Sequence, residues 1–429
     1  MESARPRKAT QWLFGAWLAA VVFVFPIPHT IALRNLLLAA GLGVLFWIGR
    51  RSLPETASWL RPATWTLVAL TAWIVFHSVA VAPAPAVALD QFRSNWLIPL
   101  LLGAIAAWAA AQLPRERAAL AIAIALAAHM VWLMHWQLGL WLATGYWPFK
   151  ATPFGAYDYH GTLNSYLLAL VAADRLVWML QHRSPLALGS GTGWILLLLT
   201  LLAGMAIQSR NSTVVSLAIL SAASLLLLTV RASDKRALVA VSLVAVISAG
   251  SLSLDSRWQG FRESAAVGWS ATSTYWMTND VATRPGTPSG ATLEESAYAR
   301  SAWASQAVGF IAEHPLGIGF GHDAFGRAIA KKYDYSGMGS SHSGWLDFAL
   351  GTGLAGLALL LVTAGLAIRD GWREFRERNN AQALLLAFFV GGYTLRCLLD
   401  GHLSGWRLGL FAFIVGVLVA GTKNPRTDS

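Results

Sequence analysis

The sequence predicts an all-α polytopic membrane protein with about twelve transmembrane helices and one large segment outside the membrane. Of its 429 residues, 56% are hydrophobic and 12% are charged, whereas a soluble domain usually carries about a quarter charged residues. The apolar residues form many runs that are long enough to cross a bilayer, and the charged residues gather between these runs. These observations exclude a soluble enzyme and a single hydrophobic core with loops.

The expected spans follow from the thickness of a bilayer. Its hydrocarbon core of about 30 Å needs about 20 residues of helix, at about 1.5 Å per residue. The apolar runs that meet this length lie near residues 11–28, 31–48, 64–82, 95–112, 118–137, 161–180, 192–209, 212–230, 237–253, 342–367, 381–398 and 404–421. We therefore expect nine helices in residues 1–253, a large outside segment at 254–341, three further helices in 342–421 and a short cytoplasmic tail at 422–429.

The basic residues predict the orientation of these spans. If the N-terminus is cytoplasmic, eighteen lysines and arginines lie on cytoplasmic segments and six lie on the short outside segments. Because cytoplasmic loops carry the excess of basic residues in membrane proteins, we expect both termini in the cytoplasm and residues 254–341 on the outside. The same excess accounts for the net charge of +11, so we expect no nucleic-acid partner.

The outside segment contains one well-marked helix. Thr292 followed by Glu295 forms a capping-box pattern that begins this helix, and Pro315 with Gly317 ends it. Arg300 shares one helix face with the apolar residues Trp303, Ala304, Ala307 and Ile311. An apolar face on an outside helix is expected to pack on the membrane domain, which would direct Arg300 towards that domain.

Arg210 and Arg300 are candidate ligands for a phosphorylated substrate. Arg210 stands between two apolar runs at the outside surface, and Arg300 faces the same surface. Alone, Arg210 is equally well explained as an arginine that reaches lipid phosphates, and Arg300 as a charge on a helix surface. Together they predict an anion site, because planar guanidinium groups bind phosphate oxygens through paired hydrogen bonds.

His342 is the candidate general base. It lies between small residues where the outside segment becomes a span, and its reference pKa of about 6.5 suits it to take a proton at neutral pH. The alternative is a histidine that caps the N-terminus of a helix. No paired His/Cys spacing indicates zinc, and the outside segments hold no Asp-x-Asp pair, so we expect no metal and no cofactor. The run LGIGFG at 316–321 is not a dinucleotide fingerprint, because it follows a helix and not a strand.

Three short motifs resemble those of bacterial O-antigen ligases and the related O-antigen polymerases. They are AIQSRNS at 206–212, RSAWASQAVGFIAEHPLGIGFGHDAF at 300–325 and SSHSGWLDFALGTGLAG at 340–356. The resemblance implies a polytopic membrane glycosyltransferase, similar in fold to GT-C-type lipid-linked glycan transferases, in the bacterial inner membrane with a periplasmic active site. It further implies that a glycan passes from undecaprenyl-pyrophosphate to a sugar hydroxyl of the lipid A core, with inversion and without a metal.

The resemblance also assigns roles to residues. Arg210 and Arg300 match the family's arginines, which stabilise the pyrophosphate, and His342 matches the histidine that deprotonates the acceptor. Two further candidates are weaker: Arg93 would add positive charge around the donor, and Asp400 would orient His342 or contact the acceptor. A solvated turn carboxylate explains Asp400 equally well.

The expected partners are the lipid-linked donor, the lipid A core acceptor and membrane lipids, and the protein is expected to be monomeric or weakly associated. An O-antigen polymerase, which uses a second lipid-linked glycan as acceptor, is the main alternative. A lipid or glycan transporter is the alternative from another class. Transporters typically show repeated halves with charges in the middle of the membrane, whereas the notable charges here gather at one face.

Overall fold

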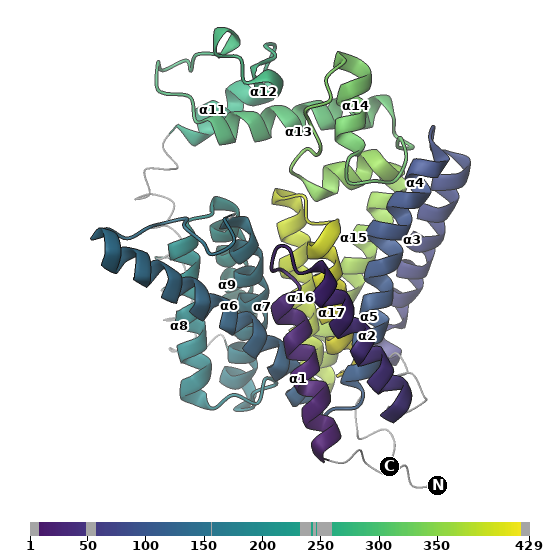
Figure 1. Ribbon diagram of the computed structural model, residues 1–429, viewed down its shortest axis with the longest axis vertical. Helices are drawn as coiled ribbons and strands as arrows, with labels where there is room; N and C mark the ends of the chain where they lie inside the picture. The colour runs from purple at the N-terminus through teal and green to yellow at the C-terminus, as the bar shows by residue number, and fades with distance from the viewer. Residues whose placement is uncertain are drawn as a thin grey trace.

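The computed structural model describes residues 8–48, 57–155, 157–231 and 260–421, together with positions 242 and 246. Within these ranges the chain forms helices and connecting turns, without a β-strand. Most helices run side by side in one bundle, and a smaller group lies across one end of it (Figure 1). We call this end of the bundle the capped end.

The bundle consists of long apolar helices. They are α1 (Lys8–Val24), α2 (Ile31–Ile48), α3 (Arg61–Ala80), α4 (Pro85–Phe92), α5 (Ile98–Ala110), α6 (Arg115–Thr144), α7 (Tyr157–Gln181), α8 (Ser190–Ile207), α9 (Arg210–Val230), α15 (Gly344–Arg378), α16 (Ala381–Leu399) and α17 (Gly405–Ala420). A π-helical turn, Arg93–Leu97, joins α4 to α5, so that one continuous rod runs from residue 85 to residue 110.

These helices bear out the expectation of a multi-pass membrane protein. Among the described residues, eight helices are long and apolar enough to cross a membrane, and three more, α1, α2 and α17, are apolar but shorter. They correspond to eleven of the expected spans, and the remaining one, at 237–253, lies outside the described residues. Large apolar side chains such as Trp47, Ile195 and Met205 are exposed on their surfaces, as is usual for helices that face lipid.

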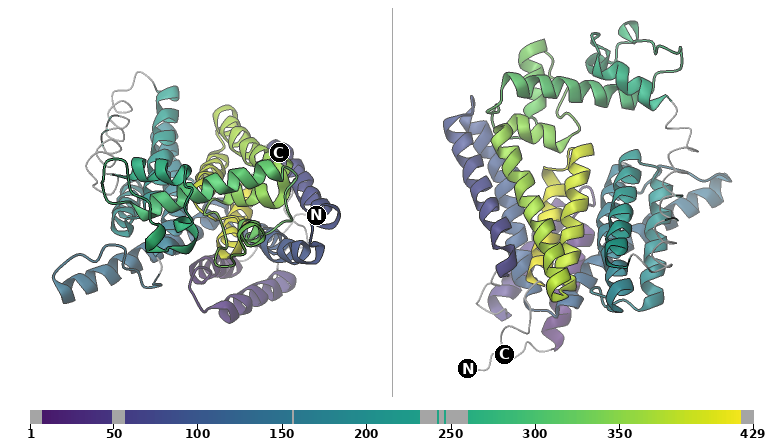
Figure 2. Two further views of the ribbon diagram at one scale, coloured as in Figure 1. Left: turned by 90° about the horizontal axis from the view of Figure 1, so that it is seen from above. Right: turned by 180° about the vertical axis from the view of Figure 1, so that it is seen from behind.

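Four helices form the cap: α11 (Phe261–Trp269), α12 (Tyr275–Thr278), α13 (Glu295–Glu313) and α14 (Ala324–Tyr333). They lie together at the end of the bundle opposite the start of α1 and the end of α17 (Figures 1 and 2). The cap has its own core, in which Phe310, Phe325 and Ile329 pack against Leu350 of α15. The cap is therefore attached to the membrane helices through the first turns of α15.

The α13 helix packs as the sequence predicts but begins two residues later than the capping-box pattern places it. Its N-cap is Glu294, whose carboxylate accepts a hydrogen bond from the amide of Ala297 at 2.7 Å. Ala307 and Ile311 are buried, and Arg300 reaches down to the carbonyl of Leu399 at the end of α16. Contacts with α15 and α16 thus cover the face that the sequence assigns to the membrane domain.

The centre of the bundle is the pair α7 and α16. These two are the most deeply buried of the membrane-length helices and pack against each other. Their ends at the capped end carry Asp158 on α7 and Arg396 on α16. Arg396 is therefore enclosed completely by the protein, and Asp158 is mostly enclosed by it.

The α15 helix is broken at Gly353, whose backbone angles are φ 75° and ψ 173°. The loop after α13 docks into this break, because the amide of Ile318 donates to the carbonyl of Leu350 at 2.8 Å and the amide of Leu354 donates to the carbonyl of Pro315 at 3.0 Å. A Cβ atom at Gly353 would lie 2.6 Å from the backbone of Leu316, so only glycine fits there. The glycine-rich run LGIGFG thus serves as a docking loop for α15.

Candidate active site

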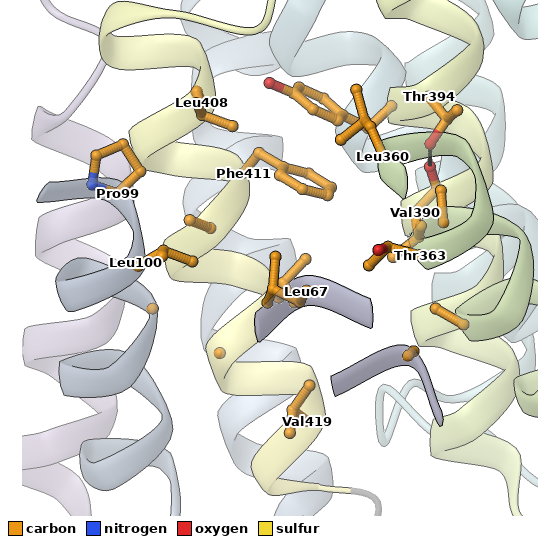
Figure 3. A pocket seen from close by; sticks show the side chains of 18 of the residues that line it. Leu67, Pro99, Leu100, Leu360, Thr363, Val390, Thr394, Leu408, Phe411 and Val419 are labelled. Carbon is orange, nitrogen blue, oxygen red and sulfur yellow. Dashed lines mark hydrogen bonds between the residues drawn. The ribbon is translucent and has the colours of Figure 1, made fainter. Parts of the chain in front are cut away.

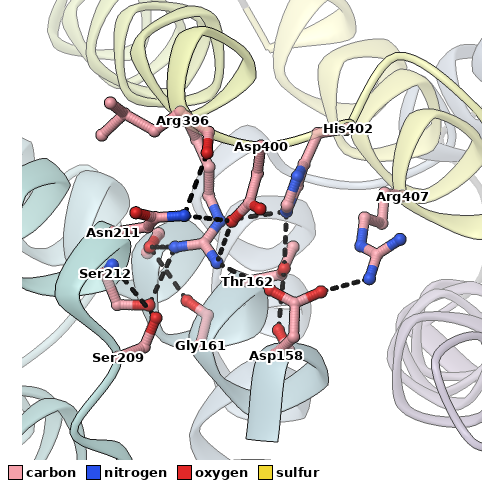
Figure 4. A network of polar contacts seen from close by, with 12 residues as sticks. Asp158, Gly161, Thr162, Ser209, Asn211, Ser212, Arg396, Asp400, His402 and Arg407 are labelled. Atoms are coloured by element: carbon pink, nitrogen blue, oxygen red, sulfur yellow. Dashed lines mark hydrogen bonds and ion pairs between the residues drawn. The ribbon is translucent and has the colours of Figure 1, made fainter. Parts of the chain in front are cut away.

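Arg396 is the hub of a polar network at the capped end of the bundle (Figure 4). Its side chain is completely buried. The guanidinium contacts five side chains: Nη2 lies 3.2 Å from Asp158 and 3.5 Å from Asp400, Nη1 donates to Ser165 at 3.1 Å and to Ser212 at 2.9 Å, and Nε donates to His402 at 3.0 Å. These partners come from α7, α9 and the α16–α17 loop, so one side chain ties three parts of the bundle together.

The carboxylate of Asp158 joins this hub to a second arginine. One oxygen faces Arg396, and the other forms a short ion pair with Arg407 at the start of α17. His402 lies between these groups, with Nε2 at 2.7 Å from the hydroxyl oxygen of Thr162. Burial, together with the positive charges of Arg396 and Arg407, holds the pKa of His402 well below its ordinary value. His402 is therefore neutral and accepts the hydrogen bond from Arg396 through Nε2.

Asp400 connects the network to the cap. Its Oδ2 accepts a hydrogen bond from Asn211 at 3.0 Å, and its Oδ1 lies 3.5 Å from Nη1 of Arg300 on α13. The same Arg300 nitrogen donates to the carbonyl of Leu399 at 2.9 Å. The Arg300 side chain is about one-third exposed, at 34%, so it lines the surface of the network and not its interior.

Arg210, the first residue of α9, lies beside the N-terminus of α13. Its Nη1 forms an ion pair with Glu294 at 2.8 Å, and its guanidinium lies over the ring of Phe261, 5.6 Å from the centroid. The Arg210 side chain is 21% exposed. Glu294 therefore both caps α13 and fixes Arg210 against the cap.

His342, in the loop before α15, lies against the face of α13 that carries Arg300 and Trp303. Its ring stacks on Trp303, with centroids 4.8 Å apart and planes 20° apart, and its backbone has a positive φ of 57°. His342 is exposed, but the protein around its ring partly desolvates it and lowers its pKa. The positive charge of Arg300 lowers the pKa further, and the negative charge of Asp400 opposes both effects. The imidazole is consequently neutral at pH 7 and able to accept a proton.

The structure thus brings four of the five sequence-predicted residues to one end of the bundle. Arg210, Arg300 and His342 lie along α13, and Asp400 contacts Arg300 directly. Arg93 lies apart from them on the surface, where its recorded ion pair is with Asp90 at 2.8 Å and its side chain is 71% exposed. It has no recorded contact with the network within the described ranges.

Sequence patterns do not identify the half of the site around Arg396. They place Arg396 and Arg407 among the basic residues of the short outside segments, and they assign no role to Asp158 or His402. A signal was nevertheless present, because Asp158 opens one span while Arg396 closes another and Arg407 opens a third, all at the same predicted membrane boundary. Ionisable groups at such positions are costly unless they pair, and opposite charges at one boundary are the natural partners.

One group of three potential metal ligands occurs among the described residues. Oxygen or nitrogen atoms of Asp158, Asp400 and His402 lie within 4.8 Å of one another. The guanidinium of Arg396 already contacts all three of them. A divalent cation would have to displace a buried positive charge, so this arrangement fits a structural arginine better than a metal.

An apolar cavity of about 360 Å³ lies among the membrane helices next to the network (Figure 3). Its lining comes from α3, α5, α15, α16 and α17 and includes Leu67, Leu100, Phe411 and Val419. Cys397 and Leu403, which flank the network in sequence, also line it. The cavity therefore extends from the polar network into the apolar part of the bundle.

Comparison with known proteins gives one result. Residues 195–361, less than half of the chain, match the family model described as O-antigen ligase. This chain carries a domain of the O-antigen ligase family. The matched region contains Arg210, Arg300 and His342, whereas Asp158, Arg396 and Asp400 lie outside it. No curated protein matches the sequence.

The similarity of this region to the family supports glycosyltransferase-like activity of the ligase or polymerase type in general, on lipid-linked glycan substrates. The matched residues include most of α8, all of α9, the described cap helices and the first half of α15 with its break. The helices α7 and α16, which supply the hub of the network, lie outside the matched residues. The site is therefore built jointly by the matched domain and the membrane helices that follow and precede it.

Proposed function

We propose that this protein is an O-antigen ligase that transfers a glycan from undecaprenyl-pyrophosphate to a sugar hydroxyl of the lipid A core, at the periplasmic face of the bacterial inner membrane. The observation that carries this proposal is the arrangement along α13. Glu294 at its start holds Arg210, Arg300 follows in its second turn, and Trp303 stacks on His342. Two cations and one neutral imidazole therefore share a surface that substrates can reach.

The two arginines suit the pyrophosphate of the donor. Each is partly exposed and paired with a single carboxylate, Arg210 with Glu294 and Arg300 with Asp400. A pyrophosphate offers more oxygen acceptors than either carboxylate, and each charge-assisted hydrogen bond contributes about 1.5–3 kcal/mol. Stabilising the charge of the leaving group in this way is what departure of a pyrophosphate requires.

His342 suits the acceptor. In the proposed step the acceptor oxygen attacks the anomeric carbon, its proton passes to the imidazole of His342, and the bond from that carbon to the pyrophosphate oxygen breaks. The electron pair leaves on the pyrophosphate, where Arg210 and Arg300 stabilise it. A single displacement of this kind inverts the anomeric centre and calls for no metal. A positioned general base typically contributes a factor of about 10² to 10⁴ to the rate.

The apolar cavity supports a lipid-linked donor. It is lined by carbon atoms over most of its surface and reaches Cys397 and Leu403, next to Arg396 and Asp400. Part of a polyprenyl chain in this cavity would leave its phosphates near the charged network. Burial of such a chain contributes about 0.8 kcal/mol for each CH₂ group removed from water.

The test is transfer by the purified protein in lipid nanodiscs, with a lipid-linked glycan donor and either lipid A core or a second donor as acceptor. We expect product with the lipid A core, and we expect His342→Ala to abolish it while membrane insertion is retained. His314→Ala is the matched control, because His314 is an exposed histidine at the end of the same helix. Full activity of His342→Ala would remove His342 from the mechanism. Product only with a second donor would make the protein a polymerase, and no product with either acceptor would overturn the proposal.

A further inference from the structure

A second, polar pocket opens at the capped end beside the network. Its volume is about 180 Å³, and it lies between the loop after α13, the start of α15 and the loop between α16 and α17. The residues that define it are Phe320, His322, Ser340, Asp347, Gly401 and Arg407. Of these, only Arg407 belongs to the charged network already described.

Asp347 is the most informative residue of this pocket. Only 6% of it is exposed, although it carries a carboxyl group. Its Oδ1 accepts a hydrogen bond from the amide of Ser341 at 2.8 Å, and its Oδ2 lies on the side of Gly401, 4.0 Å from the position that a Cβ atom of Gly401 would occupy. Oδ1 of Asp347 therefore holds the backbone at Ser341, next to His342, and Oδ2 faces Gly401 in the loop between α16 and α17.

The rest of the wall supplies complementary groups. Arg407 lines the pocket, and its Nε is buried without a recorded partner among the described residues. Ser340 adds a hydroxyl group. Phe320 and Phe348 form an aromatic surface, with ring centroids 6.0 Å apart, and both pack against Trp96. The pocket thus combines hydrogen-bond donors, acceptors and aromatic carbon in a small volume.

This combination distinguishes between the possible ligands of a glycan transferase. A phosphate group is disfavoured, because the Asp347 carboxyl presents acceptor oxygens to it and Arg407 is already paired with Asp158. An alkyl chain is disfavoured because it offers no hydrogen-bond donor to the carboxyl group that faces the pocket. A neutral sugar ring suits the pocket, since its hydroxyl groups donate hydrogen bonds to the Asp347 carboxyl and its carbon face packs on the aromatic rings.

The pocket is also placed to serve the reaction. Ser340 and Gly344, which lie on either side of His342 in sequence, both line it. The arginines proposed to hold the pyrophosphate lie instead along α13. We propose that this pocket binds a neutral pyranose ring of one of the two transfer substrates, with Asp347 accepting hydrogen bonds from its hydroxyl groups. This inference rests on the proposed function for the identity of those substrates.

The test measures sugar binding separately from transfer, with the intact protein in nanodiscs. The probes are the core oligosaccharide released from lipopolysaccharide, for the acceptor, and the free O-antigen oligosaccharide, for the donor, each titrated by calorimetry. We expect Asp347→Asn, which keeps an acceptor for the Ser341 amide, to weaken the binding of one probe about tenfold or more. Asp334→Asn is the control, because Asp334 is an exposed carboxylate of the cap.

A second variant, Gly401→Leu, tests the pocket while Asp347 stays unchanged. A Cβ atom at Gly401 would meet Ser340 and Asp347 at 3.7 and 4.0 Å, which are ordinary contact distances, so a side chain there enters the pocket without a clash at its first atom. We expect Gly401→Leu to weaken the same probe at least as much as Asp347→Asn, with an unchanged melting temperature.

The outcome identifies the source of the ring. Weaker binding of the core oligosaccharide, together with a raised KM for the acceptor alone, assigns the pocket to the acceptor, and the corresponding changes for the donor assign it to the donor. Wild-type affinity for both probes in Asp347→Asn and Gly401→Leu would overturn the proposal. If the wild-type protein binds a probe but forms no transfer product, the proposed function fails while the pocket stands. If product forms and neither variant changes KM or binding, the pocket fails while the function stands.

Discussion

Replacing Arg396 by methionine should strongly destabilise the membrane bundle. The substitution keeps a long, flexible side chain but removes two ion contacts, to Asp158 and Asp400, and three hydrogen bonds, to Ser165, Ser212 and His402. Removing one partner of a buried ion pair typically costs about 3–5 kcal/mol, because the remaining charge stays buried and unpaired.

The lower end of this range applies here. Asp158 keeps its ion pair with Arg407, and Asp400 keeps its contacts with Arg300 and Asn211. We therefore expect a loss of about 3 kcal/mol, which corresponds to a fall in melting temperature of about 6 °C at about 2 °C per kcal/mol. The assay is the apparent melting temperature of the purified protein, followed by intrinsic fluorescence at one fixed heating rate.

Arg93→Met provides the matched control. Arg93 forms an exposed ion pair with Asp90, and such surface pairs typically contribute 0–1 kcal/mol. The melting temperature of the Arg93→Met protein should therefore stay within about 2 °C of the wild type. If Arg396→Met melts within the same interval as this control, the guanidinium does not hold α7, α9 and the α16–α17 loop together, and the reasoning fails.

Three further predictions concern transfer activity. Arg210→Lys should reduce transfer, because an ammonium group cannot form two parallel hydrogen bonds to phosphate, and unimpaired transfer would favour an arginine that merely contacts Glu294 or lipid. The pH profile should depend on His342: its pKa is lowered, so activity is present above that pKa and is lost as the pH falls through it. Arg300→Gln removes a positive charge that lowers the pKa of His342, so activity should be lost at a higher pH than in the wild type. Asp400→Asn removes a negative charge that raises this pKa, so activity should persist to lower pH. If the acidic side of the profile moves in neither variant, protonation of His342 does not control the rate. Transfer should also survive EDTA, and a loss of activity that a divalent cation restores would refute the metal-free mechanism.

Sequence patterns predicted the half of the site along α13, because that half depends on which side of the membrane each residue lies. The positions of Arg210, Arg300 and His342 relative to the apolar runs were enough to place them at one face. The half around Arg396 depends on which helices are neighbours. Asp158 and Arg396 are 238 residues apart in sequence, and only the packing of α7 on α16 brings them to 3.2 Å. Hydropathy carries no information about such neighbours.

Local rules also failed where tertiary contacts competed with them. The Thr292–Glu295 pattern satisfies a capping box, yet Glu294 caps α13, because its carboxylate also pairs with Arg210 of another helix. In the same way, α15 reads as one continuous apolar run, but Gly353 allows a loop to enter it. The sequence shows that a glycine stands at position 353, but it does not show that the loop after α13 packs there.

The break in α15 gives its N-terminal turns contacts that a continuous membrane helix would not have. Bilayers differ in thickness, and helices adapt to them by tilting. In an unbroken helix a change of tilt would pass directly to His342 and Asp347 at its N-terminal end. Here the turns before Gly353 are clamped by the loop after α13 and by Trp73 of α3, whose indole nitrogen donates to the carbonyl of Thr352 at 2.8 Å. The same loop also accepts a hydrogen bond from the amide of Leu354 after the break, so contacts within the protein hold both sides of Gly353. The position of the N-terminal turns of α15 therefore does not depend on the tilt of its membrane-spanning part alone.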